Sequence, residues 1–535
     1  MVLFALLLRL PGLHFTVEHY GDAPVRVEAA ERWAQAPHLF RGFSDAFQYG
    51  PLHLALIGLA LELHPDRFLS PRLVSLFFGL LGVWLLFRLA RRAAGLPAAW
   101  LAALGLSLGT LHLQASTSAA SEAIYLALLL ACVELLVLAG AFELSAAPAQ
   151  EGAPVPVPTP SRVALLTTCA ALVLAAAGLV RYDGWMMAPL FCAVLLFGVW
   201  RRSFPLWALV LFTAVCAAPA LYWMRQNLLD SGEPLRQLRC VNEAHRDLVV
   251  IAERQYGKPG WRLYGLVYWP LNVLILSSPL LGLFSLWGAG RVLWQRARAG
   301  VAGALTNGWE LSLLAWLPVM YFTFRTVVVG DFRPLARFVM PAAALSLPFA
   351  WSALEQLAAL LGRAASRFGG EAAPWAVRRR TALLALSLGL AAATPLCFLR
   401  LSYHQYTNLA EWARPLSPIS SVPVGVEETA LLLRKLVKPG EYVLLDGVWH
   451  YLDIPIAFES GLPEEQLVRR SYDNFDQKLA QVGPPRWAVV ISEGSLTTTK
   501  GAEGATWEAR RFGFRGTNYC RVEKFAYSAV FERCQ

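Results

Sequence analysis

A polar stretch near the start of the chain carries the residues best suited to chemistry. Residues 18–53 contain five carboxylates, whereas the segments on either side are strongly apolar. Asp22 lies where this stretch leaves the first apolar segment, and His19 lies close to it in the sequence. A carboxylate held at such a position can act as a general base, taking a proton from a hydroxyl group. Asp22 is therefore the first candidate catalytic residue.

The other acids of this stretch have a simpler explanation. Glu28, Glu31 and Arg32 are spaced as neighbours on a helix. We therefore predict an amphipathic helix lying on the membrane surface, with Glu28 and Glu31 on its solvated face. Glu18 and Asp45 receive no role.

Glu122 is a second candidate, because it opens a long apolar run. It could orient a substrate or share a divalent cation with Asp22. The structural alternative is a carboxylate that complements a helix dipole, with Ser118 or Ser121 as the cap. Both explanations stay open, and no metal site is assigned.

A group of arginines lies beside later apolar runs, on the side that we predict to be the outer face. The short turn of residues 324–338 holds three of them, against the bias that places positive charge in the cytoplasm. Arginine presents a planar fork to phosphate oxygens, so a phosphate-bearing ligand would explain them. Pairing with Asp183, Asp331 or the C-terminal tail is the structural alternative. The phosphate-binding candidates are Arg181, Arg225, Arg333 and Arg337.

The composition indicates how these residues are positioned. The 535-residue chain is 56% hydrophobic and only 16% charged, with a mean hydropathy of +0.46. Apolar runs of about 17–25 residues recur, the length that crosses about 30 Å of hydrocarbon. This excludes an ordinary soluble protein. The net charge of +10 comes from arginines at the ends of apolar runs, so nucleic-acid binding is not expected.

Hydropathy predicts a polytopic α-helical membrane domain over residues 1–400, with about eleven spans and thirteen as the upper bound. Residues 51–63 are too short to cross and are predicted to be re-entrant or interfacial. The predicted spans are residues 1–15, 71–88, 96–113, 122–140, 163–180, 184–200, 204–222, 264–290, 309–324, 338–361 and 381–399.

Clusters of arginine place the N-terminus in the cytoplasm and the C-terminus outside. Residues 145–162 then form a Pro-rich cytoplasmic linker, and residues 225–262 a long polar outer loop. Residues 401–535 are predicted to form a small extracytoplasmic α/β domain. Its expected elements are helices at 426–440 and 463–479 and strands at 441–447 and 486–494.

The eight cysteines fit this plan. No spacing among them suggests a zinc site. Cys520 and Cys534 lie in the C-terminal tail and could form a disulfide if the tail faces an oxidising compartment. Cys240 would then have no disulfide partner. The other five lie in or beside apolar runs and are most simply packing residues.

Several motifs occur in the order found in a known superfamily. The chain resembles the GT-C glycosyltransferases that use polyprenyl-phosphate sugars, especially the bacterial protein O-mannosyltransferase and aminoarabinose transferase group. One departure is that many relatives have Asp-Glu in the first loop, whereas here Ala23 follows Asp22, so Glu122 is a candidate substitute. The motifs are LRLPG at 8–12, GDA at 21–23, YGPLH at 49–53, the run from 70 to 92, SE at 121–122, RYDG at 181–184 and RFVMP at 337–341.

The resemblance implies a glycosyltransferase of the bacterial inner membrane. Its donor would be a polyprenyl-phosphate sugar and its acceptor a glycan, lipid or protein at the outer face. Asp22 would be the base of an inverting transfer, with Glu122 beside it and a divalent cation as an optional cofactor. The competing hypotheses are a transporter or flippase of lipid-linked or anionic precursors and a structural subunit of an envelope complex. Further substrate-binding candidates are Tyr49, His53 and Asp183, which lie in these motifs, and His19, which precedes the GDA motif.

Overall fold

The computed structural model divides the chain into two compact units. Unit 1 comprises Met1–His14 and Ala29–Trp412, and unit 2 comprises Phe15–Glu28 and Ala413–Gln535. Each unit is described by itself. The structure describes residues 1–13, 22–46, 49–142, 159–277, 279–298, 308–332, 335–367, 425–447, 453–470, 475–491, 496, 504–526 and 528–534.

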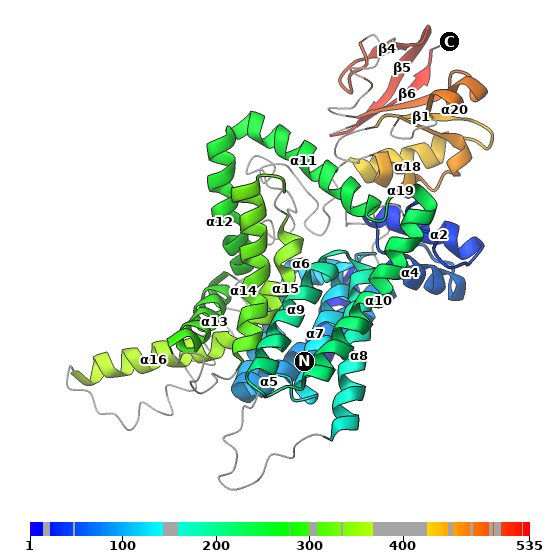
Figure 1. Ribbon diagram of the computed structural model, residues 1–535. Coiled ribbons are helices and arrows are strands. Elements are labelled where there is room, and N and C mark those ends of the chain that lie inside the picture. The colour runs from blue at the N-terminus through cyan, green and yellow to red at the C-terminus, as the bar shows by residue number, and fades with distance from the viewer. Residues whose placement is uncertain are drawn as a thin grey trace. The chain divides into compact units, whose positions relative to one another are not determined.

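The described part of unit 1 is helical (Figure 1). A further helix, α2 (Ala23–Gln35), begins in unit 2 and ends in unit 1. The remaining helices are α1 (Val2–Leu13), α3 (Phe43–Ala46), α4 (Pro51–Leu63), α5 (Leu69–Leu108), α6 (Thr110–Ala115), α7 (Glu122–Leu138), α8 (Pro160–Val180), α9 (Asp183–Trp200), α10 (Leu206–Ser231), α11 (Arg236–Tyr256), α12 (Lys258–Leu276), α13 (Pro279–Arg298), α14 (Trp309–Phe324), η1 (Arg325–Val329), η2 (Ala336–Val339), α15 (Met340–Ser346), η3 (Leu347–Phe349) and α16 (Ala350–Arg367).

Seven helices of the described residues are long and apolar enough to cross a membrane, and an eighth is added if α12 and α13 form one bent span. The chain is therefore a multi-pass membrane protein. Residues 51–63, predicted to be re-entrant or interfacial, form the short apolar helix α4. The predicted span at 381–399 and most of the Pro-rich linker lie outside the described residues. The total of eleven spans stays a prediction.

The region predicted as one span at 264–290 consists of two helices, α12 and α13, which meet at a bend of 113°. Pro279 opens α13, and proline disfavours helical geometry in the residue before it. The span at 71–88 lies in the first part of α5, and the span at 96–113 begins in its second part and ends in α6. Non-helical backbone at Ala94 and Gly95 separates the two parts of α5, between the two predicted spans.

The segment 225–262, predicted to be a polar outer loop, is nearly all helical, because it contains the end of α10, all of α11 and the start of α12. Its outer position stays a prediction. The α11 segment is polar, and polarity favoured a loop. It nevertheless buries Gln237, His245 and Val249, which are separated by multiples of four residues and so share one helical face. Gly232 and Gly257, both with positive φ, end α10 and α11.

Helix α7 is the central element of the bundle. It lies against α5 and α8, and α8 in turn contacts α10 (Figure 1). In its most apolar window 72% of the residues are buried, a share exceeded among the candidate spans of the described residues by Ala336–Leu360 alone, at 83%. A helix that is apolar on all sides is expected in such a position. Toward its C-terminal end Glu134 pairs with Arg88 at 2.6 Å and with Arg92 at 3.2 Å.

Unit 2 contains a six-stranded sheet of order β2-β1-β3-β6-β5-β4. The strands β1 to β3 are parallel, and β3, β6, β5 and β4 pair antiparallel in that order. The elements are α18 (Val426–Leu436), β1 (Val443–Leu445), α19 (Asp453–Ser460), η5 (Glu464–Gln466), β2 (Leu467–Arg469), α20 (Phe475–Val482), β3 (Trp487–Ile491), β4 (Arg511–Phe514), β5 (Thr517–Lys524) and β6 (Ser528–Arg533).

Alternation along the strands gives the sheet two apolar faces. Val443 and Leu445 belong to one core cluster, whereas Leu444 between them belongs to the other. The helix predicted at 463–479 is wrong in its first half, because β2 lies there with all three residues buried. Cys520 and Cys534 form a disulfide, with their Cα atoms 5.3 Å apart.

Gly50, which precedes α4, marks a close approach between two chain segments. A Cβ atom there would lie 2.3 Å from the carbonyl oxygens of Leu179 and Val180. Because backbone cannot move aside cheaply, we predict that Gly50→Ala destabilises the protein by about 1–3 kcal/mol. The measurement is thermal unfolding in detergent. The matched control is Gly290→Ala in α13, where a Cβ meets nothing within 4 Å. Equal melting temperatures for the two variants would contradict the prediction.

Candidate active site

The first residue of α7, Glu122, is a carboxylate buried in an apolar bundle. Its side chain is 1% exposed. A buried carboxylate is stable as an ion only when positive charge and hydrogen bonds replace water. The capping serines predicted as an alternative do not act on α7, because Ser118 donates to the carbonyl of Gln114 and Ser121 makes no cap hydrogen bond. The partners of Glu122 come from other helices.

Two arginines supply the countercharge. Arg181, the residue that ends α8, donates from Nη1 to Oε1 of Glu122 and to Oγ of Ser121, the latter at 3.2 Å. Arg337, in η2, lies farther away, with Nη1 3.8 Å from the same carboxylate oxygen. Glu122 thus joins the start of α7, the end of α8 and the segment before α15.

Asp183, the first residue of α9, completes the cluster. Its Oδ2 accepts hydrogen bonds from Nε of Arg181 at 2.9 Å and is 2.7 Å from Nη2. The Arg181 guanidinium therefore contacts two carboxylates with all three of its nitrogens. Pairing with Asp183 is the structural alternative considered from the sequence, and it is present here.

Aromatic rings border the two guanidinium groups. The Arg181 guanidinium lies 5.6 Å from the ring centre of Phe338 and 6.0 Å from that of Tyr125. Arg337 lies 5.8 Å from Phe338. These distances permit cation–π attraction, which strengthens where water is excluded. Neither ring was a candidate site residue from the sequence, although Phe338 directly follows Arg337 in the RFVMP motif.

The motif around Tyr49 contacts this cluster through its backbone. The hydroxyl of Tyr182, between Arg181 and Asp183 in the chain, donates to the carbonyl of Tyr49 at 3.0 Å and accepts from Nε1 of Trp223 at 3.3 Å. Burial raises the pKa of Tyr182, so its hydroxyl keeps its proton and stays a donor. His53, one turn into α4, is buried. The YGPLH and RYDG motifs are thus brought together, as expected of parts of one site.

Asp22 belongs to unit 2 and lies immediately before α2. Its side chain is 29% exposed, and its Oδ2 lies 3.4 Å from Nη2 of Arg26. Its carbonyl accepts the first hydrogen bond of α2, from the amide of Arg26 at 3.3 Å. A carboxylate that is partly exposed beside a cation can accept a proton from a hydroxyl group.

The acids that follow Asp22 differ from the prediction. Glu28 was expected on a solvated face, but its side chain is only 13% exposed and pairs with Arg469 at 3.1 Å. Glu31 pairs with Arg67 at 3.1 Å, with both side chains 30% exposed. The prediction failed for Glu28 because its partner lies 441 residues away in the sequence.

The remaining candidates are placed as follows. His19 and Arg333 lie outside the described residues. Arg225 is exposed on α10, and no ion pair among the described residues joins it to Glu122. No group of three or more His, Cys, Asp or Glu side chains within the described part could hold a metal ion. A cation shared by Asp22 and Glu122 stays a prediction.

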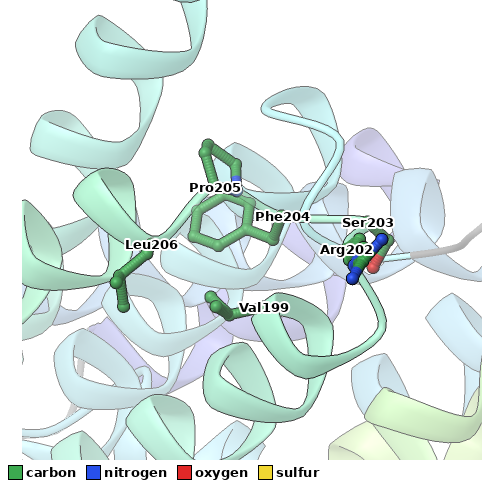
Figure 2. A pocket seen from close by; sticks show the side chains of 6 residues that line it. All are labelled: Val199, Arg202, Ser203, Phe204, Pro205 and Leu206. Carbon is green, nitrogen blue, oxygen red and sulfur yellow. The ribbon is translucent and has the colours of Figure 1, made fainter.

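A pocket of about 380 Å³ lies elsewhere, at the turn between α9 and α10 (Figure 2). Its lining contains none of the candidate residues, and it lies at the opposite end of α9 from Asp183. We assign it no part in the site. The lining residues are Val199, Arg202, Ser203, Phe204, Pro205 and Leu206.

Solved structures share the fold over nearly the whole chain. ArnT from Cupriavidus metallidurans bound to undecaprenyl phosphate matches with a TM-score of 0.57 at 16% identity, over 99% of this chain and 96% of that one. Its apo state matches with a TM-score of 0.55 at 15% identity, with the same coverage. The apo oligosaccharyltransferase of Archaeoglobus fulgidus matches with a TM-score of 0.50 at 13% identity, over 92% of this chain and 69% of that one. No family model and no curated protein sequence matches the chain significantly.

Removing Arg181 should be costly, because it leaves Glu122 in an apolar interior with a weaker partner. We predict that Arg181→Met destabilises the protein by about 3–5 kcal/mol, and that adding Glu122→Gln recovers part of this loss. Thermal unfolding in detergent measures both. Arg239→Met is the control, because this 51%-exposed arginine pairs with the 40%-exposed Glu233 and should contribute about 1 kcal/mol or less. If Arg181→Met and Arg239→Met cost the same, the buried pair does not stabilise the bundle.

Proposed function

Because the chain has the GT-C fold, we propose that it transfers a sugar from a polyprenyl-phosphate donor to an acceptor at the outer face of the bacterial cytoplasmic membrane. The observation that carries the proposal is the buried cluster of Glu122, Arg181, Asp183 and Arg337, where ends of several membrane helices present guanidinium groups at one end of the bundle. The likeness to ArnT bound to undecaprenyl phosphate supports a lipid phosphate as the ligand.

In the proposed reaction Asp22 acts as general base. Its carboxylate takes the proton of the acceptor hydroxyl while that oxygen attacks the anomeric carbon of the sugar. The bond between the anomeric carbon and the phosphate oxygen breaks, and the lipid phosphate leaves with the electron pair. Attack from the side opposite the phosphate inverts the anomeric configuration. A positioned base of this kind contributes about 10²–10⁴-fold to the rate.

The arginines have different proposed parts. Arg181 is held by two carboxylates, so its charge is largely compensated and its guanidinium is fixed in direction. Arg337 has the longer contact to Glu122, and its side chain is 16% exposed. We assign Arg337 the direct contact to the departing phosphate, where charge builds in the transition state. Arg181 orients the site, and Tyr49, His53 and Asp183 shape it around the donor.

The disulfide supports the proposed orientation. Structural disulfides persist in oxidising compartments and are rare in the cytosol. The Cys520–Cys534 bond in unit 2 therefore favours an extracytoplasmic sheet, in agreement with the arginine distribution. The N-terminus would then lie in the cytoplasm.

Asp22→Asn should abolish transfer, because the amide cannot accept the proton. We predict that turnover of a polyprenyl-phosphate sugar falls by about 10²-fold or more while binding of the lipid phosphate is retained. The control is Glu62→Gln, a neutralised carboxylate exposed on α4. Near-wild-type turnover by a folded Asp22→Asn protein would refute the base assignment. Movement of the lipid across vesicles without sugar transfer would favour the flippase alternative.

Cysteine labelling tests the orientation. In a chain whose five free cysteines are replaced by serine, Glu508→Cys places a thiol on a side chain that is 67% exposed in unit 2. We predict that a membrane-impermeant maleimide labels it in intact spheroplasts. Ser203→Cys, at the exposed turn between α9 and α10, should react only after permeabilisation. The reverse labelling pattern would show that the topology is opposite to the proposed one.

A further inference from the structure

Arg469 is a buried arginine of unit 2 that the proposed reaction does not use. It ends β2, and its side chain is 1% exposed. Its Nη2 lies 3.1 Å from Oε1 of Glu28 and 2.8 Å from Oε2 of Glu464. Glu464 is local, five residues earlier in the chain, whereas Glu28 lies on α2. A single guanidinium thus links the sheet to the helix that follows Asp22.

The two carboxylates are not equivalent partners. The Glu464 side chain is 44% exposed and solvated, whereas that of Glu28 is 13% exposed. Breaking an ion pair costs most where both partners are shielded from water. The link from Arg469 to Glu28 is therefore the stronger constraint. A different arginine of unit 2, Arg486, directly precedes β3 and is 47% exposed, and its ion pairs with Glu441 and Glu532 lie within unit 2.

The constraint reaches Asp22 through the helix. Glu28 is six residues after Asp22, a rise of about 9 Å along α2. Between them, the backbone amide of Arg26 donates to the carbonyl of Asp22 at 3.3 Å, and its Nη2 donates to the Asp22 carboxylate at 3.4 Å. Because a helix is stiff over two turns, a contact that holds Glu28 in place also holds the start of α2, and with it the backbone of Asp22. The division into units agrees with this link, because Phe15–Glu28 belongs to unit 2 together with the sheet, whereas Ala29–Trp412 belongs to unit 1.

We propose that Arg469 is a positioning residue for Asp22, which it holds through Glu28, so that the C-terminal sheet takes part in catalysis. This rests on the proposed role of Asp22 as the base. Asp22 acts on the acceptor hydroxyl in the transition state, so its misplacement lowers kcat and leaves the KM for the donor unchanged. A merely structural Arg469 would not produce that split.

The first test does not need activity. Hydrogen exchange of residues 22–35 is measured in the full-length protein, its Arg469→Met and Glu28→Gln variants and the control Arg486→Met. We expect each of the first two variants to speed exchange in the first turns of α2 by about tenfold or more, and the control to leave it unchanged. The double variant Glu28→Gln/Arg469→Met should be no faster than either single variant, because both remove one contact. Unchanged exchange in Arg469→Met, or additive effects, would overturn the proposal.

The second test measures transfer by the same variants from a polyprenyl-phosphate sugar. We expect kcat to fall about tenfold or more in both single variants, with the donor KM within about twofold and Arg469→Lys retaining more activity than Arg469→Met. Faster exchange with unchanged kcat would overturn the positioning role. Should Arg469→Met fail to fold, Glu28→Gln tests the same contact with the sheet sequence intact. If the wild-type protein transfers no sugar, the proposed function fails, while the exchange experiment still decides the contact.

Discussion

The buried carboxylate of Glu122 is the constraint on which unit 1 depends. An ion that is 1% exposed requires countercharge, and both arginines that provide it come from outside α7. The requirement therefore fixes the end of α8, the segment before α15 and, through Asp183, the start of α9 relative to α7. The backbone contact at Gly50 and the Tyr182 hydrogen bond then bring α4 to the same place. Chemistry and packing would therefore demand the same positions, because the charges that hold the helices together are also those that the proposed function assigns to a phosphate.

A second buried acid, Glu134, holds the C-terminal part of α7 in place. Glu134 is twelve residues beyond Glu122, about 18 Å along the helix, and pairs with Arg88 and Arg92 of α5. The helix between the two acids carries no charge and is largely buried. Each acid restricts both rotation and sliding of α7, which apolar packing alone restricts weakly, since a mostly apolar helix can find several similar packings. The charged groups thus give the bundle specificity at two separated levels.

The sequence predicted the elements whose positions depend on the free energy of transfer into the bilayer. It did not predict the contacts that depend on partners far away in the chain. Helices such as α7, α8 and α9 could be predicted because twenty apolar residues have few alternatives in a bilayer. Alternation of the spans was enough to place Glu122, Arg181, Asp183 and Arg337 at one end of the bundle. The bend between α12 and α13 was missed because hydropathy counts residues and not direction. Helix α11 and the burial of Glu28 were missed because polar side chains suggest solvent until the residue that pairs with them is known.

The division of the chain bears on how such an enzyme would work. The proposed base belongs to unit 2, whereas the cluster that is proposed to bind phosphate belongs to unit 1. Helix α2 is continuous through the division, with its first six residues in one unit and the rest in the other. Within unit 2 the helix is held at Glu28 by Arg469, and within unit 1 it is held at Glu31 by Arg67. These two ion pairs lie only three residues apart on α2. Rotation of the helix about its axis would therefore break at least one of them.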